Sequence, residues 1–554
     1  MKYGLIAAGV LLFIVAAIVL SAVLERRKLR RWLAASFGRP PQRKYSEELW
    51  GSLDAAWGYA RESDEPAVDR LTWDDLDMDA VFARLNATAS SVGEETLYAA
   101  LHRQHFDREG LAHFERAVGF FTDHPDVRLK AQVALAELGR VTGNGILKFF
   151  RDPAGQRLRR AWLFPLLTAA AVASLLSLIP LHASGAVCIV AVTMINIVVY
   201  YRTKGELDAE LTSVRYIASL VGCARRLARL DDEALRPFTG RLAALSAPLG
   251  RVGRMAGMAI GSSTSGMDFL SEYIRIFFML DFTAYHSMLS AIRKHSGECL
   301  ELYRMVGMLD AAISVASYRK SVPVWCQPEF TGGEAVELVG VVHPLLAHPV
   351  PTTVTLRRSA LITGSNASGK STFVKAVAVN TLLAQTIHTC LARSFHLQPA
   401  FVVTSMAVRD SLETGESYYI AEIKSLKRIL DRLESGTRCL CLIDEILRGT
   451  NTVERIAASA AVLGYLSGRN CLALVATHDI ELTEITGDRF DNYHFQEQVD
   501  EDGVHFDYLI REGRATTQNA IRLLDVMEYP PAIVHTAREL ADGFLQNRSW
   551  GKLP

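Results

Sequence analysis

The chain of 554 residues contains 60 lysine and arginine residues and 60 aspartate and glutamate residues, and at about 100–200 residues per domain it predicts several structural units. Its hydrophobic content of 49% and mean hydropathy of +0.14 exclude a disordered or collagen-like chain and indicate contact with a membrane. The balanced charge gives no global electrostatic reason to bind nucleic acid, so such affinity has to come from local patches.

The first 24 residues predict a transmembrane helix. Residues 3–24 carry no charge and are long enough to cross the hydrocarbon core of a bilayer, which needs about 20 apolar residues. A cleavable signal peptide is the alternative, but this apolar run is longer than the usual core of such a peptide. Because basic residues stay on the cytoplasmic side, the N-terminus is expected outside; the basic residues that follow are Arg26, Arg27, Lys28, Arg30 and Arg31.

A second apolar block, residues 161–201, is interrupted near Pro180–Gly185 and predicts a transmembrane helical hairpin. Basic residues flank both ends, which places both ends in the cytoplasm and the turn outside. A hairpin buried in a soluble core is the alternative. Asn196 is polar within the last span and is expected to hydrogen-bond to a neighbouring helix. The sequence therefore predicts three transmembrane helices in total. The protein is expected to be an integral protein of a bacterial-type inner (plasma) membrane, with its remaining domains in the cytoplasm.

The rest of the chain divides into regions by the spacing of its apolar residues. Residues 25–160 and 202–325 have apolar residues at three- and four-residue spacing, which predicts an all-α region. From 326 to 515 short β-rich runs alternate with helical stretches, which predicts an α/β domain. The expected strands are 336–342, 359–364, 439–445 and 471–477, followed by a hairpin of Tyr493–Val499 and Val504–Arg511. Residues 516–554 are expected to form C-terminal helices.

A glycine-rich motif follows the second of these strands. The sequence from Gly364 to Thr372 matches GxxxxGK[ST] and opens a predicted helix, which is the context of a phosphate-binding loop. Backbone N–H groups and the helix N-terminus bind phosphates there, Lys370 neutralises the β- and γ-phosphates, and the Ser371 hydroxyl binds Mg²⁺. The predicted nucleotide site therefore comprises Gly364, Ser365, Asn366, Ala367, Ser368, Gly369, Lys370, Ser371 and Thr372.

Two further strand ends carry residues suited to phosphate chemistry. Asp444 and Glu445 end the apolar run CLCLIDE, so Asp444 is expected to face Mg²⁺ and Glu445 to position or deprotonate the attacking water. His478 ends the next run, LALVATH, where its imidazole is expected to sense the γ-phosphate. The catalytic residues predicted are Glu445 and His478, and the metal ligands predicted are Ser371 and Asp444.

These motifs together resemble the DNA mismatch repair protein MutS family. TGSNASGKST is similar to the family's TGPNxxGKST, with Ser365 and Ala367 as departures. IDEILRGTN is similar to DEIGRGTS, with Leu447 in place of a glycine and Asn451 in place of a serine or threonine. VATHDIEL is similar to ATHxxEL, and the segment around His343 is similar to the family's Arg-His-Pro without the arginine.

The resemblance implies an ABC-type P-loop ATPase that uses ATP and Mg²⁺ and works as a homodimer. The segment that begins at Asp410 is similar to a family motif whose serine contacts the nucleotide of the opposite subunit, so Ser417 is expected to complete the partner's site. Double-stranded DNA, including mismatched DNA, is the partner that the family implies. Ser417 and the DNA partner rest on resemblance alone.

The resemblance extends more weakly into the helical region. Residues 85–101 are similar to the start of the family's lever domain, and residues 310–316 are similar to the helix that returns to the ATPase, so the membrane hairpin is expected as an insertion in the lever. The residues before Tyr45 are too few for a mismatch-recognition domain. The predicted fold is an α/β P-loop (ABC-type) ATPase preceded by an all-α lever/core domain, with three transmembrane helices. The predicted domains are 1–24, 25–160, 161–201, 202–325, 326–515 and 516–554.

Three functions remain open at this stage. The first is a membrane-anchored MutS-like ATPase that couples ATP hydrolysis to lever or clamp movement on DNA. The second is an ABC-transporter-like half, although its LSGGQ signature is absent and SLETGES stands in the corresponding segment. The third is a nucleotide-gated membrane scaffold that does not bind DNA. Phe495-Gln-Glu497 matches a mismatch wedge by chance, and the arginine-rich stretch from Arg225 to Arg241 is expected to be a solvated helix face.

Overall fold

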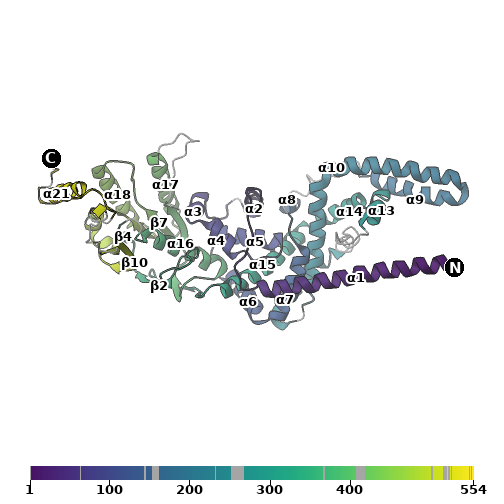
Figure 1. Cartoon of the computed structure of the whole chain (residues 1–554), viewed down its shortest axis with the longest axis horizontal. Helices are drawn as coiled ribbons and strands as arrows, with labels where there is room; N and C mark the ends of the chain where they lie inside the picture. Colours follow the sequence, from purple (N-terminus) through teal and green to yellow (C-terminus); the bar gives the residue numbers. More distant parts are fainter. Residues whose placement is uncertain are drawn as a thin grey trace. The chain divides into compact units, whose positions relative to one another are not determined.

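The computed structural model describes residues 2–62, 64–141, 145–151, 161–230, 232–250, 268–365, 368–406, 418–500, 503–515, 521, 524–525, 527–547, 549–550 and 552–553. Its contacts divide the chain into two units. The helical unit comprises Met1–Ser63, Leu85–Ala100 and Ala112–Ser321, and the α/β unit comprises Asp64–Arg84, Leu101–Leu111 and Val322–Pro554. A mostly helical N-terminal part followed by mixed α/β sheets confirms the coarse fold prediction (Figure 1).

The helical unit is built from long helices in the predicted all-α regions. Their buried faces carry leucine, valine, alanine and aromatic residues, so each helix packs through one apolar stripe. The described helices are α1 (Lys2–Ser36), α2 (Glu47–Ala60), α5 (Ser91–His102), α6 (Arg108–Asp123), α7 (Pro125–Leu138), α8 (Gly145–Arg151), α9 (Leu163–Leu181), α10 (Ala183–Leu227), α11 (Arg236–Ser246), α13 (Asp268–Phe277), α14 (Leu280–Lys294) and α15 (Ser296–Ser321).

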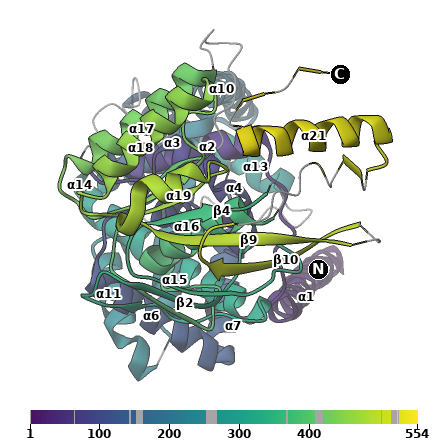
Figure 2. The ribbon, with the colours of Figure 1, turned by 90° about the vertical axis from the view of Figure 1, so that its left-hand side faces the viewer.

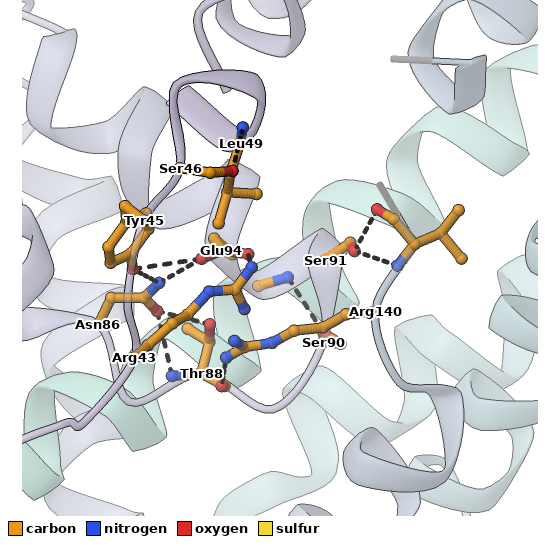
Figure 3. A network of polar contacts seen from close by, with 12 residues as sticks. Arg43, Tyr45, Ser46, Leu49, Asn86, Thr88, Ser90, Ser91, Glu94 and Arg140 are labelled. Atoms are coloured by element: carbon orange, nitrogen blue, oxygen red, sulfur yellow. Dashed lines mark hydrogen bonds and ion pairs between the residues drawn. The ribbon is translucent and has the colours of Figure 1, made fainter. Parts of the chain in front are cut away.

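Polar contacts fix the segment that follows α1 to the helical unit. The Asn86 side-chain amide donates to Tyr45 Oη at 2.6 Å and to Glu94 Oε1 at 2.7 Å, and Arg43 pairs with Glu94 at 3.0 Å (Figure 3). Burial raises the pKa of the Glu94 carboxyl, which the charge of Arg43 opposes. The amide of Gly38 also donates to Ser317 on α15. The segment after α1 is therefore held both to the residues around α5 and to the end of α15.

The predicted apolar hairpin is formed by α9 and α10. Its connection is shorter than predicted, because Pro180 lies in the last turn of α9 and only His182, with φ 44°, separates the two helices. The helices pack closely at the turn, since a Cβ on Gly185 would lie 2.8 Å from the Leu178 Cα. Among the described residues, two helical segments are long and apolar enough to cross a membrane, Leu163–Leu181 and Ala183–Gly205. The third predicted span lies in α1 and stays a prediction.

The hairpin side chains are mostly exposed. Only 22% of the apolar stretch in α9 and 17% of that in α10 is buried. Large apolar side chains such as Leu176, Ile179, Val187 and Val198 are more than half exposed. A hairpin buried in a soluble core, the alternative at the sequence level, does not fit this exposure.

The α/β unit contains two sheets. The predicted strands are confirmed as β2 (Val336–Val341), β4 (Ala360–Thr363), β7 (Cys439–Asp444), β8 (Cys471–Ala476), β9 (Asp491–Asp500) and β10 (Gly503–Glu512). Four short strands were not predicted: β1 (Glu329–Phe330), β3 (Thr352–Leu356), β5 (Ser394–Leu397) and β6 (Phe401–Ser405). The large sheet has the order β10-β9-β4-β8-β7-β6, parallel except for β10, and the small sheet has the order β1-β5-β2-β3.

Helices cover both faces of the large sheet. Strand β7 is buried along Cys439–Ile443, as expected for a parallel strand with helices on both faces. Figure 2 shows the β9–β10 hairpin reaching beyond the other strands. The helices of the unit are α3 (Arg70–Asp75), α4 (Met78–Leu85), α16 (Lys370–Ile387), α17 (Tyr418–Leu433), α18 (Thr452–Leu466), α19 (Glu481–Thr486) and α21 (Pro531–Asn547). The core on one face joins Val403, Cys441 and Val475 to Ile429 of α17 and Leu463 of α18.

Residues 64–84 and 101–111 belong to the α/β unit, although the sequence pattern placed them in the helical region. The Gln104 amide pairs with the backbone of Val402 in both directions, at 2.6 and 2.9 Å, and so satisfies part of edge strand β6. Asp75 accepts from the Thr404 hydroxyl at 2.6 Å. These hydrogen bonds join residues about 300 positions apart, which local helical periodicity cannot predict.

Candidate functional site

The glycine-rich loop, residues 364–369, connects β4 to α16. Gly364 has φ 142°, and a Cβ at this position would lie 2.6 Å from the Phe495 carbonyl oxygen, so a larger residue would push β9 away. Gly369, with φ 107°, precedes the first residue of α16. The loop therefore has the predicted strand–loop–helix context. Asn366 and Ala367 lie outside the described residues.

Lys370 is the first residue of α16 and folds back over the loop. Its ammonium donates to the carbonyls of Gly364 and Ser365 at 2.7 Å each. Burial lowers the pKa of Lys370 to about 8, against the nearby carboxylates of Asp444 and Glu445, which raise it. The ammonium therefore donates to loop carbonyls in this structure. A stronger acceptor such as phosphate could replace these carbonyls.

Asp444 and Glu445 stand at the carboxyl end of β7, as predicted. Glu445 has φ 66° and Leu447 has φ 58°, a left-handed backbone that costs energy for residues other than glycine. The Glu445 amide donates to the Ala476 carbonyl at 2.9 Å, which ties the turn to β8. Its carboxylate forms an ion pair with Arg448. The strained turn thus aims the Glu445 side chain across the strand end.

His478 follows β8 and lies between the two charged groups. Its Nε2 is 3.1 Å from Glu445 Oε1 and 3.4 Å from Lys370 Nζ. Burial and the charge of Lys370 lower the pKa of the imidazole, so it is neutral at neutral pH. The structure therefore brings together three of the predicted residues, Lys370, Glu445 and His478, from three different elements.

The predicted magnesium ligands offer oxygen donors of the kind that Mg²⁺ prefers, a hydroxyl from Ser371 and a carboxylate from Asp444. Ser371 lies in the first turn of α16, and Asp444 is close enough to Lys370 to raise its pKa. No cluster of three His, Cys, Asp or Glu side chains that could hold a metal occurs among the described residues. Two protein oxygens leave room for nucleotide phosphates and water, which fits the coordination habits of Mg²⁺.

A cavity of about 570 Å³ borders the glycine-rich loop. Its wall includes Lys370, Ser371 and Thr372, together with residues that the sequence analysis did not assign to the site. Five of these carry aromatic or imidazole side chains, His343, His348, Phe373, Phe495 and Tyr508, and most of the others are aliphatic. Burial lowers the pKa of His343 to about 4, so this imidazole is neutral. A mainly apolar wall next to phosphate-binding groups suits a heterocyclic base.

Residues of β9 border the same loop. The Ser365 hydroxyl donates to Glu497 Oε2 at 2.7 Å, and the Phe495 ring lies in the cavity wall. The Phe-x-Glu sequence is thus placed beside the glycine-rich loop. The sequence carried no signal for this, because the contact spans about 130 residues.

Other contacts position the loops around the site. Arg455 forms a two-bonded ion pair with Asp479 at 2.9 and 2.6 Å, which joins α18 to the residues after His478. Asn451 caps α18, because its side-chain oxygen accepts from the Glu454 amide at 3.0 Å. Glu422, only 3% exposed, accepts from the Arg448 amide at 3.1 Å. The sequence did not predict this contact, because Glu422 is one of several charged residues in an amphipathic helix.

Ser417, expected to act in trans, lies outside the described residues. The arginine-rich stretch is largely engaged within the helical unit. Arg225 donates to the Ser246 carbonyl, Arg226 pairs with Glu137 and Arg241 pairs with Glu301. These contacts fit the expectation that the stretch is a helix face, since its charges are balanced by partners in the same unit.

Comparison with known proteins identifies the same family that the sequence motifs resemble. The mixed α/β sheet and its helical N-terminal part fit a MutS-like layout, and residues 360–544 match the family model "MutS domain V". This match and the following relatives support membership of the MutS family. It is 29% identical over 280 residues to the DNA mismatch repair protein MutS of Natronomonas pharaonis and 32% identical over 273 residues to the DNA mismatch repair protein MutS 2 of Halobacterium salinarum. The human MutS protein homolog 4 is 29% identical over 288 residues.

These alignments cover 48%, 46% and 49% of this chain and 32%, 31% and 30% of the respective relatives. The chain therefore spans about a third of the length of the curated relatives it matches. The named relatives are mismatch repair and MutS-homolog proteins, so the transporter-half alternative is not favoured.

Proposed function

We propose that the chain is a membrane-anchored ATPase of the MutS type, in which ATP binding and hydrolysis move the helical unit as a clamp or lever on double-stranded DNA. The observation that supports the ATPase most directly is the convergence of Lys370, Glu445 and His478 at the ends of β4, β7 and β8. A lone motif would not bring a lysine, a carboxylate and an imidazole within hydrogen-bonding range. The family's ATP and Mg²⁺ are the proposed cofactors.

The proposed chemistry assigns each side chain one task. Backbone N–H groups of the loop and of the α16 N-terminus bind the phosphates, and Lys370 moves from the loop carbonyls to the phosphate oxygens. Ser371 and Asp444 would hold Mg²⁺, which neutralises phosphate charge when bound. Glu445, released from Arg448, accepts a proton from the attacking water or orients it. His478 donates or accepts hydrogen bonds between Glu445 and the γ-phosphate region, and so reports whether that phosphate is present.

The base of the nucleotide is proposed to occupy the cavity of about 570 Å³ beside the loop. Ser417 of the partner subunit is proposed to complete the site, so the active form is a homodimer. Asn366 and Ala367 belong to the proposed loop by sequence only.

Membrane anchoring is supported by the exposure of the α9–α10 hairpin. The 19 residues of α9 extend about 28 Å at helical rise, close to the thickness of a hydrocarbon core. Figure 1 shows α1 and this hairpin pointing toward the same end of the helical unit, as three spans with the N-terminus and the turn outside would require. A plasma-type membrane with the ATPase in the cytoplasm is the proposed location.

Double-stranded DNA is proposed as the partner because the relatives are DNA mismatch repair proteins. This part of the proposal most needs an experiment. The purified full chain, reconstituted in lipid, is tested for ATP hydrolysis and for binding to matched and mismatched duplexes over a salt series, with and without ATP. A DNA-binding clamp should lose affinity steeply as salt rises, because phosphate contacts release counterions. ATPase activity without duplex binding at low salt would instead support a nucleotide-gated membrane scaffold.

A further inference from the structure

The corner between α13 and α14 is held by the membrane hairpin. Helix α13 ends at Phe277, Met279 adopts a left-handed backbone with φ 50°, and α14 begins at Leu280. Such a break leaves carbonyl groups at the end of α13 without helical partners. Figure 1 shows α13 and α14 beside α9 and α10 within the helical unit.

Side chains of both hairpin helices satisfy these carbonyls. Asn196 of α10 donates its amide to the Phe277 carbonyl at 2.7 Å. Thr168 of α9 donates its hydroxyl to the Phe278 carbonyl at 2.8 Å and shares it with the Phe164 carbonyl of its own helix. The interhelical hydrogen bond predicted for Asn196 is confirmed, and its partner is a helix outside the hairpin.

Further contacts fasten the start of α14 to the same helices. The Tyr200 hydroxyl donates to Asp281 at 2.6 Å, and Arg215 pairs with the other oxygen of that carboxylate at 3.0 Å. The Phe282 ring lies 4.9 Å from the Phe164 ring and 5.4 Å from the Tyr200 ring, centroid to centroid. The corner is therefore attached to the hairpin by hydrogen bonds, an ion pair and ring packing.

The two donors lie at the same depth along the hairpin. Thr168 is five residues from Leu163, where α9 begins, and Asn196 is six residues before Arg202, the first charge after the span. At helical rise these separations are about 8 and 9 Å. The carbonyls of Phe277 and Phe278 are thus fixed inside the cytoplasmic ends of the two apolar segments.

The corner exposes large apolar and aromatic side chains, whereas its charged residues are partly buried (Arg275) or buried (Asp281). Tyr273 is 63%, Ile274 45% and Leu280 40% exposed, next to the exposed apolar surface of the hairpin. Non-helical backbone at membrane depth is tolerated only where protein satisfies its polar groups, and Asn196 and Thr168 do this here. Tyrosine is typical of the interface between hydrocarbon and water.

We propose that residues Tyr273–Phe282 form an additional membrane-embedded element, which enters the cytoplasmic leaflet beside the hairpin and returns to the cytoplasmic side. The partner of its exposed face is the acyl-chain region of the lipid bilayer. This inference rests on the proposal that α9 and α10 cross the membrane. Because α14 continues into α15 and α15 leads into the α/β unit at Val322, the embedded corner lies on the chain path toward the ATPase.

The test uses the full chain in liposomes that contain lipids with a nitroxide quencher at a shallow acyl position. Cys188, Cys326 and Cys471, the three native cysteines that are exposed or partly exposed, are first replaced by serine. Single cysteines labelled with a small fluorophore are placed at Tyr273, Ile274 or Leu280, with Ile195 in the hairpin as positive control and Val453 on α18 as negative control. Probes at the three corner positions should lose fluorescence as the Ile195 probe does, and the Val453 probe should keep it.

Quenching at Ile195 without quenching at the three corner positions would overturn the embedded corner and leave the membrane hairpin intact. Absence of quenching at Ile195 would overturn the spanning hairpin, and this inference with it. The two failures are therefore distinguishable.

A second set of variants tests the anchors. Thr168→Val combined with Asn196→Leu removes both donors and should reduce quenching of the Ile274 probe while the Ile195 probe stays quenched. Thr193→Val is the matched control, since the Thr193 hydroxyl donates only to Ile189 of its own helix and the corner should stay in place. Unchanged quenching at Ile274 in the double variant would refute Asn196 and Thr168 as the anchors.

Discussion

The hydroxyl of Ser365 donates to Glu497 Oε2 at 2.7 Å, so a buried carboxylate of β9 contacts the glycine-rich loop directly. The same carboxylate acts on Lys370, whose pKa it raises against the lowering effect of burial. A negative charge beside a triphosphate site opposes anion binding. We therefore expect Glu497 to hold the loop in shape and, if the loop binds a nucleotide as proposed, to weaken its affinity.

Glu497→Gln should strengthen ATP binding. The glutamine keeps an oxygen acceptor for Ser365 and removes the negative charge, a change of about 1 kcal/mol or about fivefold in affinity for charges at this range. Titration calorimetry of the full chain measures it. Ser365→Ala is the control, because it removes the hydrogen bond, keeps the charge and should not raise affinity. Equal affinities for the parent and Glu497→Gln would contradict the electrostatic role.

ATP affinity should fall as pH rises above about 8. Burial lowers the pKa of Lys370 to about 8, so the ammonium that phosphate needs is lost above that pH and must be regained on binding. Affinity should then decrease by up to about tenfold per pH unit, which equilibrium binding between pH 7 and 9.5 measures. Lys370→Arg keeps a charge over this range and should flatten the profile. The same slope in Lys370→Arg would show that another group titrates.

Glu445→Gln should slow ATP hydrolysis and spare ATP binding. The amide cannot take a proton from water, and loss of a general base costs about 10²–10⁴ in rate. Single-turnover hydrolysis and nucleotide titration measure the two effects separately. Glu434→Gln, which changes an exposed carboxylate after α17, is the matched control. Parental turnover in Glu445→Gln would remove Glu445 from the mechanism.

Subunits with different defects should complement each other. If Ser417 serves the partner's nucleotide, a heterodimer of Lys370→Ala and Ser417→Ala chains has one site with both residues intact. Co-expression should therefore restore part of the ATPase activity that either variant lacks alone. Each homodimer serves as the control. If both residues served the nucleotide of one chain, every site would be broken and no activity would return.

The membrane topology predicts a labelling pattern in intact cells. In a Cys188→Ser background, a cysteine at Ser184, beside the hairpin turn, should react with an impermeant thiol reagent, because the turn is expected outside. A cysteine at Ser549 should react only after the cells are permeabilised. Labelling at Ser549 but not at Ser184 in intact cells would reverse the proposed orientation.

The elements that depend on residues close together in the sequence could be predicted from the sequence. The glycine-rich loop follows from Gly364 and Gly369, whose positive φ values a larger residue would resist, and strands β4, β7 and β8 follow from short apolar runs. The edge strand β6 escaped prediction; it pairs with β7 on one side and with the Gln104 side chain, about 300 positions away, on the other. Local propensity carries no information about such partners.

The candidate site likewise has one part that the sequence predicted and one part that only the tertiary structure revealed. Glu445 and His478 stand at strand ends that the sequence marks, and the parallel arrangement of those strands brings them to one edge of the sheet. Phe495 and Glu497 reach the loop only because β9 pairs with β4 in a register that packing of the whole sheet sets. Likewise, Asn196 in the sequence is a polar residue in an apolar helix, and its partner, the Phe277 carbonyl, exists only where folding places the end of α13 against the hairpin.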